Sequence, residues 1–195
     1  MIPTTYADHR GAEMPPATKR IFMSNVGKGN WAEGLVAEAL SRIPDCTIAK
    51  NSPEYRVTKR TGRTINGGFF LAPGKLDFSG GYKRMHVEFD VKRAGHKVKR
   101  WNFRSGIAEH QIDRAEKLMN AGDIVAFLLC WDQEGGKTPC RWFWVPYDVL
   151  ECEMMDGAKS FSQGDLELLV EDTKVVELDH FDLSDGLDYS FDREV

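Results

Sequence analysis

The stretch from Leu76 to Lys92, LDFSGGYKRMHVEFDVK, decides how the rest of the chain is organised. It ends in a predicted strand in which polar and apolar residues alternate. Because successive side chains of a strand point to opposite faces, Glu88, Asp90 and Lys92 share one face. The apolar residues between them would anchor the strand, so the charged face is presented at an edge of the core.

A second strand is expected to lie beside this one. If Gly80 and Gly81 form a turn, the segment of Asp77 folds back and adds a third carboxylate to the charged face. Such a cluster of oxygen ligands suits a hard divalent cation. The alternative is an ordinary solvated strand face with cross-strand ion pairs, and the local pattern alone does not separate the two.

The length and composition are those of one soluble globular domain. The chain has 195 residues, 42% hydrophobic and 29% charged, and contains no apolar run long enough to span a bilayer. The N-terminus lacks the features of a secretion signal, so we expect a cytoplasmic protein with no membrane association. The four cysteines are widely spaced without a C-x-x-C pair, which predicts reduced thiols rather than a zinc site or a disulfide framework.

Charge is segregated along the chain. Residues 50–104 contain 14 Lys and Arg against 4 Asp and Glu, a net charge of +10, whereas residues 105–195 contain 7 against 21, a net charge of −14. Three of the four acids in the basic block are those of the opening stretch. A basic surface around converging carboxylates suits an enzyme that acts on a polyanion. The alternative is a basic face that folds against the acidic C-terminal third.

The periodicities predict an α/β fold, with helices on both sides of a mixed sheet. A helix is expected to be capped by Asn30, to carry Glu33 and to end before Pro44, and a second amphipathic helix spans Ile107–Ala121. The run Ile124–Trp131 is apolar throughout and predicts a buried central strand. We expect an irregular arm over residues 1–25, one domain over residues 26–155, and an acidic extension over residues 156–195, of which the end, residues 179–195, is partly disordered.

Two basic segments flank the acidic strand. Arg56–Phe70 is too polar to form core and predicts a projecting hairpin or loop, which could bind phosphates or be an ordinary solvated hairpin. The segment that begins two residues after Lys92, AGHKVKRWNFRSG (94–106), could hold a phosphate backbone, or its Trp101 and Phe103 could return to the core. No nucleophile elbow, phosphate-binding loop or dinucleotide fingerprint is present, and the histidines have no metal-ligand spacing.

The order of these motifs resembles the PD-(D/E)XK nuclease superfamily and, within it, the RecU-type Holliday junction resolvases. That family has an Asp-aromatic-Asn-Gly turn, a strand ending acid-Phe-Glu-x-Lys and a helix opening with His-x-His-Gln. The matching residues are Asp77-Phe78-Ser79-Gly80, Glu88-Phe89-Asp90-Val91-Lys92 and Glu109-His110-Gln111. The resemblance covers about residues 25–150. It departs from the family at Lys75-Leu76, where the family has Thr-Thr, and at Asp90, where it has Glu.

The resemblance implies a restriction-endonuclease-like core, a central mixed β-sheet flanked by helices with a projecting basic stalk at Arg56–Phe70. It also implies that Asp77, Asp90, the Val91 carbonyl and Glu33 bind Mg2+, for which Mn2+ can substitute. Lys92 would activate water or stabilise charge on the phosphate, with Gln111 in support. The expected DNA contacts are basic residues on both sides of the acidic strand: Lys59, Arg60, Arg63, Lys75, Arg93, Lys97, Lys99, Arg100 and Arg104.

The function implied is resolution of four-way DNA junctions by paired nicks, in which metal-activated water attacks the phosphodiester. Because two paired nicks are needed, the resemblance implies a homodimer that acts on branched DNA. Two alternatives stay open: a nuclease of the same superfamily that cuts flaps, ends or duplex, and a junction-binding protein without catalysis. Divergence from the bacterial pattern favours a phage or mobile-element origin.

Overall fold

The computed structural model describes residues 25–52, 55–61, 64–70, 75–133 and 140–194. The predicted arm therefore lies outside the described residues, apart from Asn25. That residue begins helix α1 (Asn25–Leu40), so the helix starts five residues before the predicted cap at Asn30. It ends ahead of Pro44, as expected.

The fold is an α/β arrangement around a mixed six-stranded sheet, which confirms the predicted class. The strand order is β1-β4-β5-β7-β8-β10. Neighbouring strands run antiparallel except β5 and β7, which are parallel. The strands are β1 (Ala49–Lys50), β4 (Phe78–Tyr82), β5 (Met85–Ala94), β7 (Ile124–Trp131), β8 (Arg141–Pro146) and β10 (Val176–Glu177).

The parallel pairing of β5 and β7 requires a crossover, which residues 95–123 supply. This segment contains β6 (Trp101–Asn102), α2 (Phe103–Gly106) and α3 (Glu109–Asn120). Trp101 and Phe103 are buried in the core, so the reading in which these aromatics return to the core is confirmed. Ser160–Phe161 (β9) pairs with β6 and fixes the crossover to the C-terminal part of the chain.

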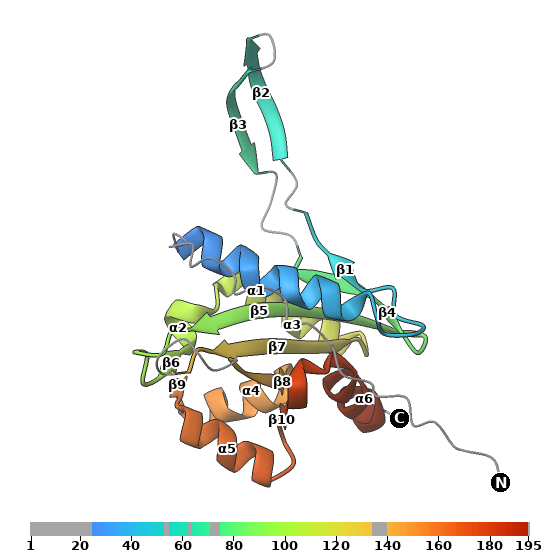
Figure 1. The fold of residues 1–195 in the computed structure, drawn as a ribbon, viewed down its shortest axis with the longest axis vertical. Coiled ribbons are helices and arrows are strands. Elements are labelled where there is room, and N and C mark those ends of the chain that lie inside the picture. The colour runs from blue at the N-terminus through green and yellow to red at the C-terminus, as the bar shows by residue number, and fades with distance from the viewer. Residues whose placement is uncertain (1–24, 53–54, 62–63, 71–74, 134–139, 195) are drawn as a thin grey trace, which may run out of the picture.

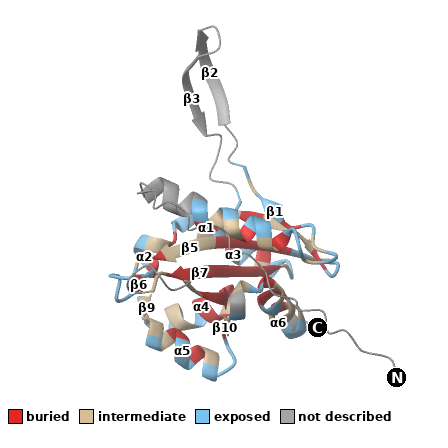
Figure 2. Cartoon of the chain, viewed as in Figure 1, coloured by how far each residue is buried: buried red, intermediate tan, exposed pale blue. Residues whose placement is uncertain are grey.

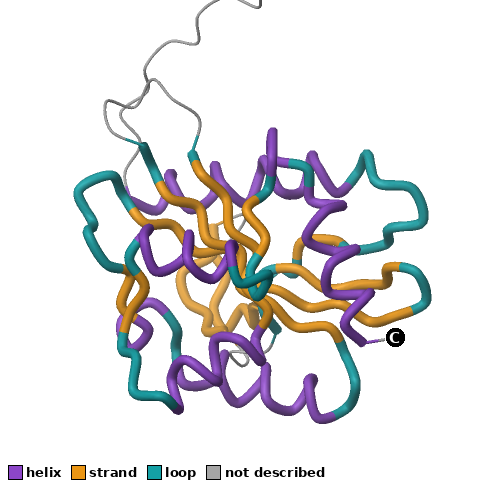
Figure 3. The backbone as a smooth tube through the Cα atoms, turned by 90° about the horizontal axis from the view of Figure 1, so that it is seen from below, coloured by secondary structure: helices purple, strands orange, loops and turns teal. Residues whose placement is uncertain are grey.

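Helices cover both faces of the sheet, and each face has its own apolar core (Figure 3). Ala32, Val36 and Leu40 of α1 pack on one face, together with Val87 and Phe89 of β5. Helix α6 (Leu183–Glu194) covers the same face. Helices α3, α4 (Tyr147–Met155) and α5 (Gln163–Glu171) pack on the opposite face. Every residue of β7 is buried between the two layers, as its continuous apolar sequence predicted (Figure 2).

The turn between β4 and β5 differs from the prediction. Gly80 and Gly81 lie inside β4, and the turn residues are Lys83 and Arg84, which have φ values of 46° and 72°. Two positive φ values are typical of a two-residue hairpin, a conformation that the sequence Lys-Arg does not signal. Gly80 is instead needed because a Cβ there would collide with the backbone of Thr47 and Ile48.

The prediction that the acidic end, residues 179–195, is partly disordered is wrong for its described residues, 179–194. Residues 156–194 form β9, α5, β10, the 3-10 helix Asp179–Phe181 and α6. Val176 pairs with Trp144 of β8, and Leu187 is fully buried against the same core as α1. The acids lie mainly on the outer faces of these elements, while regularly spaced leucines supply the apolar contacts that order them.

A separate hairpin, β2 (Tyr55–Thr61) and β3 (Thr64–Phe70), forms where the sequence predicted a projecting basic segment. Figure 1 shows it standing away from the six-stranded sheet. Its pairing is irregular between Val57 and Arg60. Within the described residues, no helix combines the length and apolar character needed to cross a bilayer.

Candidate active site

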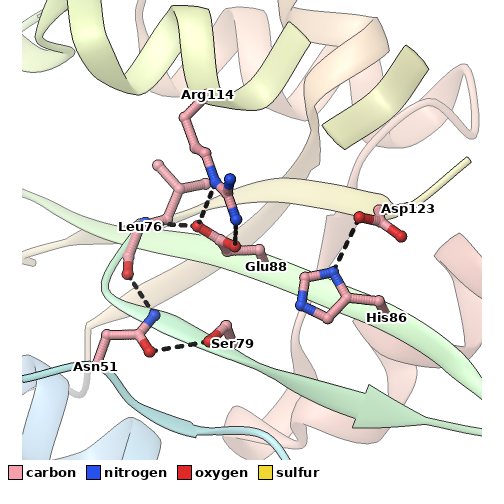
Figure 4. A network of polar contacts seen from close by, with 7 residues as sticks. All are labelled: Asn51, Leu76, Ser79, His86, Glu88, Arg114 and Asp123. Atoms are coloured by element: carbon pink, nitrogen blue, oxygen red, sulfur yellow. Dashed lines mark hydrogen bonds and ion pairs between the residues drawn. The ribbon is translucent and has the colours of Figure 1, made fainter. Parts of the chain in front are cut away.

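The charged face of β5 is built on an ion pair between the buried Glu88 and the partly exposed Arg114 of α3. The Glu88 side chain is 0% exposed, and both of its oxygens accept hydrogen bonds from Arg114, at 2.8 and 3.2 Å. Glu88 also accepts a 2.8 Å hydrogen bond from the backbone N–H of Leu76 (Figure 4). Its carboxylate is therefore fully engaged and holds the residue just before Asp77 in place.

Asn51 holds the same segment from the other side. Its side-chain amide donates to the Leu76 carbonyl at 2.7 Å, and its backbone N–H donates to the Asp77 carbonyl, also at 2.7 Å. The Asn51 side-chain oxygen in turn accepts a hydrogen bond from Ser79 (Figure 4). Asn51 was not singled out from the sequence, because an asparagine after a short strand carries no signal of its partner.

These contacts bring Asp77 to the neighbouring position of Asp90. Phe78 pairs with Phe89 in the β4–β5 ladder, so Asp77 and Asp90 are the next positions along the two strands. Asp77 Oδ2 accepts a 3.0 Å hydrogen bond from the backbone N–H of Val91. The two carboxylates that the sequence predicted to converge are therefore adjacent.

Asp90 is the centre of the site and is only 2% exposed. Its Oδ1 lies 2.9 Å from the ammonium nitrogen of Lys92, and its Oδ2 accepts a hydrogen bond from Gln111. Lys92 also donates to the Gln111 side-chain oxygen at 2.8 Å. Asp90, Lys92 and Gln111 thus form a closed triangle of polar contacts, in which an amide holds both members of an ion pair.

Gln111 links this triangle to the start of α3. It is the third residue of the helix, and its side-chain oxygen also accepts a 3.1 Å hydrogen bond from the backbone N–H of Ala108. The glutamine therefore caps the helix N-terminus, where backbone N–H groups lack helical partners. The Gln111 side chain therefore bonds to the end of α3 and to Asp90 and Lys92 at the same time. This fixes the position of the helix end relative to the charged face of β5.

The surroundings favour the protonated form of Asp90. Burial, with the neighbouring carboxylate of Asp77, raises the pKa of Asp90 from 3.8 to about 7, although the charge of Lys92 lowers it. A second positive charge beside the two carboxylates would relieve this repulsion. The pair has the oxygen ligands and the charge that a hard divalent cation such as Mg2+ requires, so these residues fit the expected ion.

Glu33 is not part of this cluster. It lies on α1, whose apolar residues cover the opposite face of the sheet from α3, and its carboxylate is 2.6 Å from the ammonium of Lys50. In the described ranges, Glu33, Asp77 and Asp90 do not form a group whose ligand oxygens all lie within 4.8 Å of one another. Val91 contacts Asp77 through its backbone N–H.

The predicted DNA-binding residues fall into three groups. Lys75, Lys97, Lys99 and Arg104 are exposed. Arg100 is exposed but bonded to Asp165 and Ser160, and Arg93 is half-buried and bonded to Asp132. Lys59 and Arg60 lie on β2 of the hairpin, and Arg63 lies outside the described residues.

Comparison with known proteins does not assign a family to the chain. A scan against protein-family models gives no match, and a search of curated proteins gives none.

Proposed function

We propose that this protein is a divalent-metal-dependent endonuclease with a restriction-endonuclease-like core. The observation that carries the proposal is the constellation of Asp77, Asp90, Lys92 and Gln111. Two adjacent carboxylates, one of them buried, stand beside an ammonium group that an amide holds in place. An ion pair that served stability alone would not need a second carboxylate beside it, because like charges repel.

Asp77 and Asp90 are the residues that would bind Mg2+, or Mn2+ in its place, and the Val91 carbonyl would supply a further oxygen ligand. When bound, the ion supplies activation of water and compensation of charge on the phosphodiester. The backbone N–H of Val91 orients Asp77, and Gln111 orients Asp90. Both carboxylates are thereby held in advance, which lowers the reorganisation needed for binding.

Lys92 supplies a fixed positive charge at the edge of the site. Its side chain is 16% exposed, so its ammonium can reach a phosphate while Gln111 still holds it. A positive charge placed where negative charge develops on the phosphate lowers the barrier, because it needs no rearrangement during the reaction. We assign Lys92 this electrostatic role and Gln111 a positioning role.

We propose branched DNA, in particular four-way junctions, as the substrate, and a homodimer as the active form. The support is the hairpin β2–β3 standing away from the body, the exposed cations around the site, and the motif resemblance to the RecU-type resolvases. Contacts with phosphates dominate such binding, so affinity for DNA should fall steeply as salt rises.

The test is cleavage of synthetic four-way junctions, flaps and linear duplex by the full chain, with Mg2+, with Mn2+ and with a chelator. We expect Asp77→Asn to lower the rate of junction cleavage by at least about 100-fold, the effect typical of losing a main electrostatic group, while binding is preserved. Asp113→Asn, an exposed carboxylate on α3, is the matched control and should cut normally.

Each outcome identifies a different function. Full activity of Asp77→Asn would overturn the assigned site. Equal cleavage of duplex and junction would reject the resolvase assignment and retain the nuclease. Tight junction binding without cleavage under any metal condition would identify a junction-binding protein.

A further inference from the structure

A second group of ligand side chains lies on the other face of the sheet from Asp90. The ligand atoms of Cys130, Asp132 and Cys140 all lie within 4.8 Å of one another. Cys130 is the last but one residue of β7, whereas Asp132 directly follows β7 and Cys140 directly precedes β8. Trp131 and Arg141 form the last pair of the antiparallel β7–β8 ladder. Asp132 and Cys140 are the next residues beyond this pair, so they lie opposite each other.

The spacing of Cys140 and Asp132 is that of two ligands of one ion. The Cys140 thiol donates a hydrogen bond to Asp132 Oδ1, with sulfur and oxygen 3.4 Å apart. In a tetrahedral zinc site, Zn–S bonds of about 2.3 Å and Zn–O bonds of about 2.0 Å place sulfur and oxygen about 3.5 Å apart and two sulfurs about 3.8 Å apart. The cysteine and the aspartate are therefore already at the separation that a bound ion requires.

Arg93 of β5 completes the electrostatics of the cluster. Its guanidinium donates to both oxygens of Asp132 at 2.8 Å and lies 5.4 Å from the centre of the Trp31 ring on α1. Two thiolates and the carboxylate carry three negative charges, which one divalent cation and Arg93 neutralise. Neutrality matters because Cys130 is fully buried, and an uncompensated charge there would be unfavourable.

We propose that Cys130, Asp132 and Cys140 form a binding site for a thiophilic divalent cation, of which Zn2+ is the type. Thiolate ligands favour Zn2+ over Mg2+, so this site would differ in its metal from the Asp77–Asp90 pair. Arg93 orients the Asp132 carboxylate, as hydrogen-bonded partners of metal ligands commonly do. The bound ion would join the ends of β7 and β8 and, through Arg93, β5. The proposal does not depend on the nuclease assignment.

The test is a titration of the full chain, freed of metal and reduced in the absence of oxygen, with Co2+ as the spectroscopic probe. We expect one Co2+ per chain, with thiolate-to-cobalt charge-transfer absorption and the intense visible bands of tetrahedral cobalt, both removed by Zn2+. Cys140→Ser should weaken binding by more than about 100-fold, since losing even an outer partner weakens metal sites by about 10–100-fold. Cys152→Ser is the matched control, because Cys152 is exposed and lies outside the cluster, and should bind like the unaltered chain.

Two results of the titration would overturn the proposal: the absence of a charge-transfer band, or Co2+ binding by Cys140→Ser as tight as that of the unaltered chain. A reduced chain that binds no metal, and that forms a Cys130–Cys140 disulfide on oxidation, would overturn it as well. If Cys140→Ser does not fold, alkylation of the unaltered chain decides the question. Saturating Zn2+ should then protect the partly exposed Cys140, but not the exposed Cys152, from a thiol reagent, as read by mass spectrometry. Cys130 is shielded by burial in either state and is not part of this readout. Equal labelling of Cys140 with and without Zn2+ would contradict the site.

Discussion

At its C-terminal end, β5 has two chemically different faces. Toward α3 it presents Asp90 and Lys92, which contact Gln111 and the carboxylate of Asp77. Toward α1 it presents Val91 and Arg93, and Arg93 pairs with Asp132 next to two cysteines. On each face, one cation of β5 pairs with an aspartate. On the α3 face a second carboxylate lies beside this pair, whereas on the α1 face two cysteine sulfurs lie beside it.

The difference follows from where each aspartate comes from. On the α3 face both acids belong to the β4–β5 hairpin, so strand alternation and register bring them together. On the α1 face the cation and its partners come from different strands, and only the parallel alignment of β5 with β7 makes them neighbours. Arg93 pairs with Cys130 in that register. Neighbouring residues of one strand can therefore serve unrelated sites.

The largest expected effect distinguishes the two faces by pH. The free energy of unfolding should depend on pH through Asp90, which lies on the α3 face. In the folded chain the pKa of Asp90 is raised to about 7, above the value of about 3.9 in an unfolded chain. Between these values the folded state holds a proton that the unfolded state has lost, so stability falls as the pH rises. Without metal, the contribution lost between pH 4 and pH 8 should be of the order of 2–4 kcal/mol.

Urea unfolding of the unaltered chain and of Asp90→Asn in a chelator, at pH 5 and pH 8, checks this effect. The variant should lose less stability than the unaltered chain over this interval, because its amide does not titrate. It should also cleave DNA at least about 100-fold more slowly, since the site loses a main charged group. The same loss of stability in both proteins would show that Asp90 does not titrate near pH 7.

The next effect concerns the buried ion pair beneath the α3 face. Arg114→Leu leaves the Glu88 carboxylate in the core without its cation, although the Leu76 N–H remains bonded to it. Removing one partner of a buried pair is strongly unfavourable, so we expect a loss of about 3 kcal/mol in the free energy of unfolding. The exposed pair of Arg42 and Glu38 supplies the control, because Arg42→Leu should change stability little.

The double variant Glu88→Gln with Arg114→Leu sharpens this result. It removes both charges, so it should recover part of the stability lost by Arg114→Leu alone, as measured by chemical denaturation. If Arg114→Leu is no less stable than Arg42→Leu, the pair does not support the segment that carries Asp77.

The smallest expected effect concerns Glu33, for which the motif resemblance implied a place in the active site. Because Glu33 lies on α1 and pairs with Lys50, we expect Glu33→Gln to lower junction cleavage by less than about tenfold, or about 1.4 kcal/mol. The rate of junction cleavage is measured under single-turnover conditions, with Asp77→Asn as the reference for a variant that has lost its cleavage activity. A loss as large as that of Asp77→Asn would show that Glu33 leaves Lys50 and joins the carboxylate pair when metal and DNA bind.

Local pattern predicted much of the candidate site. Alternation placed Glu88, Asp90 and Lys92 on one face, and helical spacing placed Gln111 in the first turns of the facing helix. The central strand β7 was also predictable, because a fully buried strand must be apolar along its whole length. These features depend on residues close together in sequence or on one simple period.

The turn at Lys83–Arg84 and the ordered C-terminal region were not predictable in this way. The turn residues carry no glycine or asparagine to signal positive φ. The acidic composition of residues 179–195 suggested partial disorder, yet Leu183 and Leu187 are almost completely buried. A few well-placed apolar side chains can order a highly charged segment when a sheet is present to receive them.

The sequence by itself determined the mixed α/β class, the central strand and the chemical identity of the charged face of β5. Only the tertiary structure decided which partner each charged side chain contacts. It engages Glu88 fully with Arg114, separates Glu33 from Asp90, and turns Arg93 toward two cysteines far along the chain. The physical reason is that alternation fixes the face on which a side chain lies, whereas its partners depend on which distant strand or helix packs there.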